Sequence, residues 1–204
     1  MTGYGYHHWH GYGGYAVKIE ELAEEFPWTG SEGRSDTLHL STIIHDLLET
    51  LFNTQASRAQ KEKATESVHS LQYEKGFLWE VALSRALGEK AAIRPGEVVV
   101  DGVSCSPDGI GFDDDGNLYV EEYKATAMSS NKPVGDILRW IMQVKAYCYV
   151  METTVAVFRV LYLMGDYKGG GPEYRVYRIE FSESELADNW VSLLNHAKSK
   201  GWLK

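Results

Sequence analysis

The chain has few cysteines, no long apolar segment and no excess of positive charge. Two cysteines among 204 residues exclude a disulfide-stapled scaffold and a four-thiolate iron–sulfur cluster. The longest apolar-rich run, VAVFRVLYLM, is interrupted by Arg159 and is far shorter than the ~20 residues of a membrane-spanning helix. The first residues lack the apolar core of a signal peptide, so we expect a cytoplasmic protein that does not bind membranes.

The charge and the length limit the class of protein further. A net charge of -9 argues against a protein that coats DNA indiscriminately, because non-specific affinity comes from neutralised phosphates. It leaves room for an enzyme with a local basic groove. With 204 residues, 44% of them hydrophobic, the chain is long enough for one sizeable hydrophobic core and too short for two domains that each bury a core of that size. We expect one domain over residues 16–204, preceded at 1–15 by a flexible Gly-, Tyr- and His-rich arm.

The most informative segment is residues 106–124, SPDGIGFDDDGNLYVEEYK. Asp108 lies in a Ser-Pro-Asp-Gly turn, and Glu122 and Lys124 end a predicted strand one hairpin later. Because side chains alternate along a strand, Glu122 and Lys124 share a face that Asp108 can reach from the neighbouring strand. Two carboxylates suit Mg²⁺ or Mn²⁺, and the lysine can orient a water or stabilise charge on a phosphate. Glu121 points the other way, and we expect its loss to do little.

Two predicted helices carry further polar residues. Gln143 and Tyr147 are four residues apart in a predicted helix at about 134–151, which places them on one face. Glu80 lies in the middle of the apolar segment GFLWEVALSRALG, where a carboxylate is either at the solvent edge or held by a partner. Glu74 is the competing acid, less favoured because an acid near a helix start is useful merely against the helix dipole. Four apolar residues of this helix are expected to face inward: Phe77, Leu78, Val81 and Leu87.

The order of these elements resembles that of the PD-(D/E)xK phosphodiesterase superfamily and its RecB/YqaJ-like branch. The elements are Glu80, Pro107-Asp108, Glu122-x-Lys124 and Gln143-x-x-x-Tyr147. The branch includes phage recombination exonucleases of the lambda-exonuclease type and CRISPR-associated RecB-like nucleases. Many of the latter carry four cluster-binding cysteines, so this chain looks more like the cluster-free phage enzymes. The resemblance covers roughly residues 35–165 and implies a restriction-endonuclease-like α/β core with a mixed central sheet flanked by helices.

The resemblance also implies roles for individual residues. One or two Mg²⁺ or Mn²⁺ ions would be held by the following groups: Glu80, Asp108, Glu122 and the backbone carbonyl of Ala125. Lys124 would position the attacking water, and Gln143 would support Lys124 or the nucleophile. Tyr147 would line the DNA groove or brace the motif. Arg34 and Ser41 are candidates for binding a terminal DNA phosphate.

The remaining segments predict a short helix at 16–26, a helix in LHLSTIIHDLLETLF and a polar helix at 54–69. Ser41 is the expected N-cap of the second of these, with Leu51 among its inward residues. After the QxxxY helix, TTVAVFRVLYLM predicts a central strand and PEYRVYRIEF a more exposed partner. Ser182 and Glu185 form a capping box before the last helix. Arg139 is a candidate for a basic DNA-binding groove.

The sequence therefore predicts a metal-dependent DNase, most like an exonuclease acting at double-stranded DNA ends in phage recombination or replication, in the host cytoplasm if the chain is viral. A structure-selective endonuclease would share every site residue, and a CRISPR-associated nuclease stays an alternative. The non-enzymatic alternative is a catalytically inert DNA-binding protein. Pairing with a single-strand annealing protein and assembly into a homo-oligomeric ring are implications of the resemblance alone.

Overall fold

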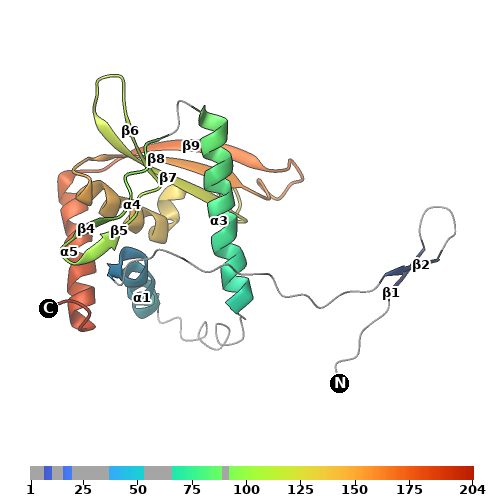
Figure 1. Ribbon diagram of the computed structural model, residues 1–204, viewed down its shortest axis with the longest axis horizontal. Helices are drawn as coiled ribbons and strands as arrows, with labels where there is room; N and C mark the ends of the chain where they lie inside the picture. The colour runs from blue at the N-terminus through green and yellow to red at the C-terminus, as the bar shows by residue number, and fades with distance from the viewer. Residues whose placement is uncertain (1–6, 11–15, 20–36, 53–65, 89–91) are drawn as a thin grey trace.

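The computed structural model describes residues 7–10, 16–19, 37–52, 66–88 and 92–204 (Figure 1). The described helices are α1 Leu40–Phe52, α3 Glu66–Leu87, α4 Leu138–Val150 and α5 Glu183–Ser199, with a 3-10 turn, η2, at Val134–Asp136. The described strands are β1 His7–His10, β2 Ala16–Ile19, β3 Leu38–His39, β4 Val98–Val100, β5 Val103–Cys105, β6 Gly109–Phe112, β7 Leu118–Thr126, β8 Val155–Tyr162 and β9 Glu173–Glu180. None of the described helices is both long and apolar enough to cross a membrane.

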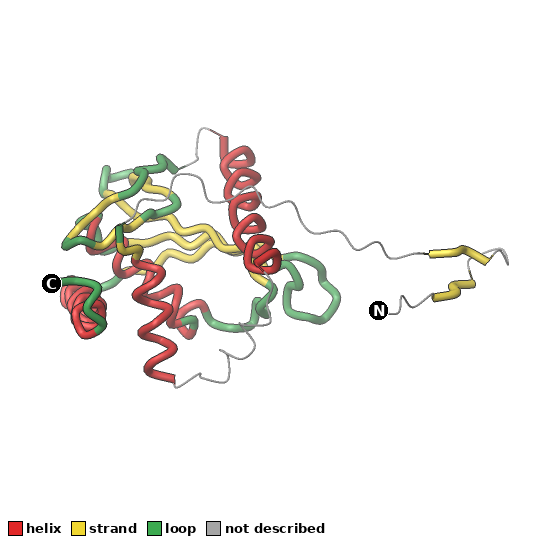
Figure 2. Tube along the Cα trace, turned by 60° about the horizontal axis from the view of Figure 1, so that its bottom comes forward, coloured by secondary structure: helices red, strands yellow, loops and turns green. Residues whose placement is uncertain are grey.

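A four-stranded sheet in the order β6-β7-β8-β9 forms the centre of the molecule. β7 and β8 run parallel, while β6 and β9 pair antiparallel with their neighbours. Parallel neighbours need a crossover, and α4 supplies it between β7 and β8. A smaller mixed sheet has the order β3-β5-β4. Helices α1, α4 and α5 contact one another, α4 packs on β7 and β8, and α3 crosses β7 (Figures 1 and 2). The predicted α/β class, with helices flanking a mixed sheet, is confirmed.

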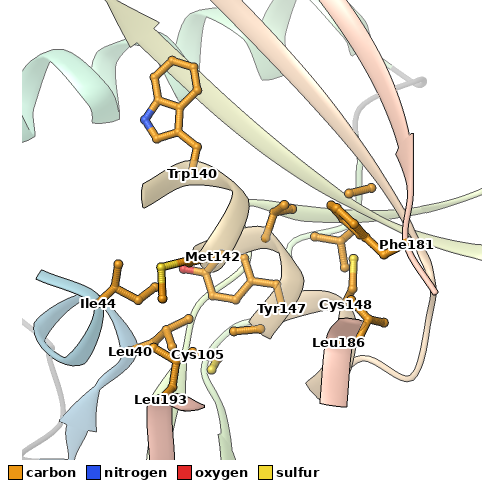
Figure 3. Close-up of a cluster of buried hydrophobic side chains, with 14 of the residues drawn as sticks. Leu40, Ile44, Cys105, Trp140, Met142, Tyr147, Cys148, Phe181, Leu186 and Leu193 are labelled. Carbon is orange, nitrogen blue, oxygen red and sulfur yellow. The ribbon is translucent and has the colours of Figure 1, made fainter. Parts of the chain in front are cut away.

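The core lies between the central sheet and α4. The parallel register places Glu122 of β7 beside Phe158 of β8. Because Trp140 of α4 stacks on Phe158, α4 covers the same face of the sheet that carries Glu122. Phe158 and Val160 are fully buried there, and Trp140 of α4 stacks on Phe158 with ring centroids 6.2 Å apart. Figure 3 shows the core continuing through α4 to α1 and α5. The site face of the sheet is therefore packed against α4 around Phe158.

Both cysteines belong to this core. Cys105 of β5 and Cys148 of α4 are free thiols with no exposed surface. Burial raises the pKa of each thiol to about 12. A thiol with so high a pKa is a poor nucleophile and a poor metal ligand. The two cysteines act as small hydrophobic residues.

The N-terminal expectations differ from the structure. Residues 16–19 form strand β2, which pairs with 7–10, where we expected a helix and an arm without regular structure. A segment this short does not separate helical from strand periodicity. The other residues of the predicted arm and helix, 1–6, 11–15 and 20–26, lie outside the described residues, as do 54–65 of the predicted polar helix. Residues 66–69 belong to α3.

Three expectations for α1 and α3 are also corrected. α1 begins at Leu40, directly after the two residues of β3, so Ser41 lies inside the helix and is not its N-cap. Leu51, in the last turn of α1, is 63% exposed. In α3, Phe77 and Leu78 are 54% and 64% exposed, while Leu83 is buried. The inward face of α3 runs instead through Glu80 and Leu83, which are three residues apart and therefore lie on one side of the helix.

Candidate active site

Asp108 is fixed against β7 by the backbone. It precedes β6, and its Oδ2 accepts the Tyr123 N–H at 2.7 Å. The following residue, Gly109, passes so close to Ala92 that an added Cβ would lie 2.5 Å from the Ala92 Cβ. Glycine therefore lets the segment that contains Ala92 lie directly against the start of β6, next to Asp108. The predicted convergence of Asp108 with the site face of β7 is present in the structure.

Lys124 is held between two site residues. Its Nζ donates to Glu122 Oε1, and also to Gln143 Oε1 at 3.2 Å. Gln143 Nε2 in turn donates to the Tyr147 hydroxyl at 2.9 Å. The Lys124 ammonium lies 6.0 Å from the centre of the Trp140 ring, within the range of a cation–π contact. The predicted link from the QxxxY helix to the strand lysine is therefore a continuous hydrogen-bonded chain.

The site carboxyls disfavour one another's charge. Burial first, and the charge of Asp108 second, raise the pKa of Glu122 to about 8, although Lys124 offsets part of the rise. Burial also raises the pKa of Asp108. For Glu80, burial and the charge of Asp108 raise the pKa. A bound cation would relieve this repulsion directly.

The residues present fit a hard divalent cation. Glu122 Oε2 is buried and has no hydrogen-bond partner among the described residues. A carboxylate oxygen left in that state is costly unless something positive binds it. Glu122 and Asp108 together offer the oxygen donors that Mg²⁺ and Mn²⁺ prefer. Two carboxylates suffice for Mg²⁺, which usually keeps several waters.

Glu80 is a more distant member of this group. Its Oε2 pairs with Arg94, and no three Asp, Glu, His or Cys side chains in the described parts of the chain are close enough to form a ready metal-binding group. Glu74 has no described side chain, so the structure places only Glu80 near the site. Ala125 follows Lys124 in β7 but is not among the residues that line the cleft.

An open cleft of about 870 Å³ joins these groups to the surface. Of the predicted site residues, the cleft is lined by Ser41, Glu80, Asp108, Glu122, Lys124, Arg139, Gln143 and Tyr147. Arg34 lies outside the described residues. Tyr147 is only 6% exposed and accepts from Gln143, which favours bracing over direct contact with DNA. Arg139, in the first turn of α4, is exposed.

The lining of the cleft is rich in acid. Six carboxylates line it: Asp46, Glu49, Glu80, Glu97, Asp108 and Glu122. Against these carboxylates, the described lining residues include one lysine, Lys124, and one arginine, Arg139. A phosphodiester that enters such a cleft is repelled unless a metal ion or a further basic side chain compensates. The excess of carboxylates favours the binding of a cation in the cleft. Binding of DNA would require further positive side chains near its entrance.

Glu121 has a structural role, although we expected that its loss would do little. It is 1% exposed, and its carboxylate accepts Arg159 Nε at 3.0 Å, Arg159 Nη2 at 2.7 Å and the Tyr123 hydroxyl at 2.7 Å. A buried carboxylate with three donors is a structural ion pair whose loss is costly. The alternation of β7 was predicted correctly, but the opposite face is buried as well.

Several residues around the cleft carry no motif and were missed. Arg94 pairs with Glu80, and Asp46 of α1 binds His196 and Lys200, each at 2.7 Å, which ties α1 to the end of α5. Trp140 could have been found, because it lies three residues before Gln143 and therefore on the same face of α4. The others depend on contacts between distant segments.

Comparison with known proteins gives distant likenesses. No family model and no curated protein matches the sequence. Among solved structures, SSO0001 is 14% identical, with 80% of this chain and 78% of that chain covered and a TM-score of 0.49. The alkaline exonuclease LHK-Exo from Laribacter hongkongensis is 16% identical, with 80% and 87% covered and a TM-score of 0.47. Its complex with dAMP is 14% identical, with 80% and 89% covered and a TM-score of 0.45.

Proposed function

We propose that this protein is a divalent-cation-dependent nuclease that hydrolyses DNA phosphodiester bonds, acting as an exonuclease at DNA ends. The single observation that carries the proposal is the Lys124 ammonium held between Glu122 and Gln143, beside a second, half-buried carboxylate, Asp108. This arrangement brings a positive donor together with two carboxylates in one open cleft, which supports the proposal.

The chain's own residues would divide the work as follows. Lys124 has three N–H donors and uses two of them on Glu122 and Gln143, which leaves one for a phosphate oxygen or the attacking water. Gln143 fixes the ammonium, and Tyr147 fixes Gln143. This pre-organisation matters because a donor already aimed at the developing charge needs no reorganisation during the reaction.

Asp108 and Glu122 would hold Mg²⁺ or Mn²⁺, with Glu80 as a further ligand. When bound, the cation would supply Lewis-acid stabilisation of the negative charge that develops on the phosphate. In the hydrolysis, the oxygen of water bonds to phosphorus, one phosphate ester bond breaks, and the leaving sugar oxygen takes up a proton.

The preference for DNA ends comes from the resemblance to phage recombination exonucleases and needs its own test. We would incubate the protein with Mg²⁺ and either a linear duplex or the same DNA as a covalently closed circle, with Asp108→Asn as the control protein. Degradation of the linear duplex alone supports an exonuclease. Degradation of both forms by wild type, but not by Asp108→Asn, indicates an endonuclease at the same site. Binding without degradation would overturn the proposal in favour of an inert DNA-binding protein.

A further inference from the structure

Arg94 is a basic residue beside the cleft that belongs to no motif of the sequence. Its Nη2 donates to Glu80 Oε2, and Glu80 lines the cleft. The Arg94 side chain is 57% exposed, whereas that of Glu80 is 21% exposed. The guanidinium therefore contacts a site carboxylate, while more than half of the arginine side chain remains exposed to solvent. A guanidinium carries five N–H donors, so one carboxylate does not exhaust it.

The backbone holds Arg94 at this place. The preceding residue, Ile93, exchanges two backbone hydrogen bonds of 2.8 Å with Ile110 of β6. Ile110 is two residues beyond Asp108, so the segment that carries Arg94 is tied to the strand that positions a site carboxylate. The positive charge of Arg94 acts on both acids, since it opposes the rise in pKa that burial causes in Glu80 and in Asp108.

The acid-rich cleft needs additional positive charge if it is to bind the DNA backbone. Lys124 is already held by Glu122 and Gln143, and the acid-rich lining leaves Arg139 as its other permanent cation in the described part of the chain. A DNA backbone needs more than one neutralising side chain to offset that lining. Arginine suits the need, because its planar fork matches two phosphate oxygens at once.

We propose that Arg94 binds a backbone phosphate of DNA at the rim of the cleft, exchanging its ion pair with Glu80 for one with the phosphate. The inference rests on the proposed function, since it takes DNA as the ligand of the same cleft. The exchange has a consequence for Glu80, whose carboxylate is released from Arg94 when DNA binds. Glu80 then becomes available to the cation site only in the presence of substrate.

The test measures binding rather than cleavage. Full-length protein is titrated into a short labelled duplex in EDTA at several salt concentrations, and the dissociation constant is read from fluorescence anisotropy. Arg94→Ala should weaken binding several-fold and reduce the slope of log K against log salt by about 0.9, the value for one lost phosphate contact. Arg178→Ala is the matched control, because Arg178 is 54% exposed and faces a carboxylate, Asp113, at 3.8 Å that does not line the cleft, whereas Glu80, the partner of Arg94, does. It should leave the slope unchanged.

A second pair of variants separates phosphate binding from simple support of Glu80. Glu80→Gln frees Arg94 and should tighten binding, and Glu80→Gln combined with Arg94→Ala should lose that gain. Glu49→Gln removes another carboxylate from the same cleft and controls for the general loss of negative charge. A gain from Glu80→Gln that survives without Arg94, or equals that of Glu49→Gln, would overturn the inference.

The outcomes also distinguish this inference from the proposed function. Wild-type cleavage with an unchanged salt slope in Arg94→Ala refutes the inference alone. An altered slope in Arg94→Ala, without any Mg²⁺-dependent cleavage by wild type, refutes the nuclease and leaves the phosphate contact standing. No detectable binding of the duplex by wild type at low salt would refute the inference as well.

Discussion

Removing the Glu121 carboxylate should destabilise the fold strongly while leaving the chemistry of the cleft in place. Glu121→Ala takes away the acceptor of two Arg159 hydrogen bonds and of the Tyr123 hydroxyl. Breaking a buried ion pair by deleting one partner costs about 3–5 kcal/mol. Arg159 keeps 17% of its side-chain surface exposed and a contact with the Tyr174 hydroxyl at 3.3 Å, which places the loss at the lower end.

The expected loss of about 3 kcal/mol corresponds to a fall in melting temperature of roughly 6–12 °C for a domain of this size. Thermal unfolding followed by circular dichroism in EDTA measures it. Glu180→Ala, an exposed carboxylate at the end of β9, is the control and should stay within about 0.5 kcal/mol of wild type. A melting temperature for Glu121→Ala equal to that of Glu180→Ala would refute the structural role. So would loss of cleavage in protein that is still folded at low temperature.

Two further predictions concern the site. Because the pKa of Glu122 is about 8 in the folded protein and 4.5 in an ordinary glutamate, the folded state keeps a proton that the unfolded chain has released. The stability of wild type in EDTA, relative to Glu122→Gln, should therefore fall as pH rises from about 4.5 to about 8, and parallel melting profiles would contradict this. In single-turnover experiments, Lys124→Ala should lower the cleavage rate more than Gln143→Ala does. The double variant should lose less activation free energy than the sum of the two single losses, because the two side chains are hydrogen-bonded and act as a unit. Strictly additive losses would mean that Gln143 works independently of Lys124.

Local periodicity accounts for the parts of the site that were predictable. Alternation along β7 separates Glu122 and Lys124 from Glu121, and a four-residue helical spacing brings Gln143 to Tyr147. Both rules operate within one element, so they need no knowledge of the sheet. The capping box of Ser182 with Glu185 was predicted for the same reason and is present.

Contacts between distant segments account for what was missed. Arg159 is 38 residues from Glu121, and their pairing depends on the parallel register of β7 and β8, which no sequence pattern specifies. Arg94 reaches Glu80 across 14 residues, because the segment before β4 is pinned to β6. The exposure of Phe77 has a similar origin, since the face that α3 presents is decided by how the helix crosses β7 and not by its own apolar content.

The cation-dependent nuclease site is tested most directly by the rate of hydrolysis of an end-labelled linear duplex as Mg²⁺ or Mn²⁺ is added to wild type and to Asp108→Asn. We expect cleavage that rises with the cation, stops in excess EDTA and falls by orders of magnitude in Asp108→Asn. Circular dichroism should show that the variant melts no lower than wild type, since the substitution removes a repelling charge from beside Glu122. Undiminished cleavage in EDTA, or wild-type rates from Asp108→Asn, would contradict the assignment of a cation-dependent nuclease site to this cleft.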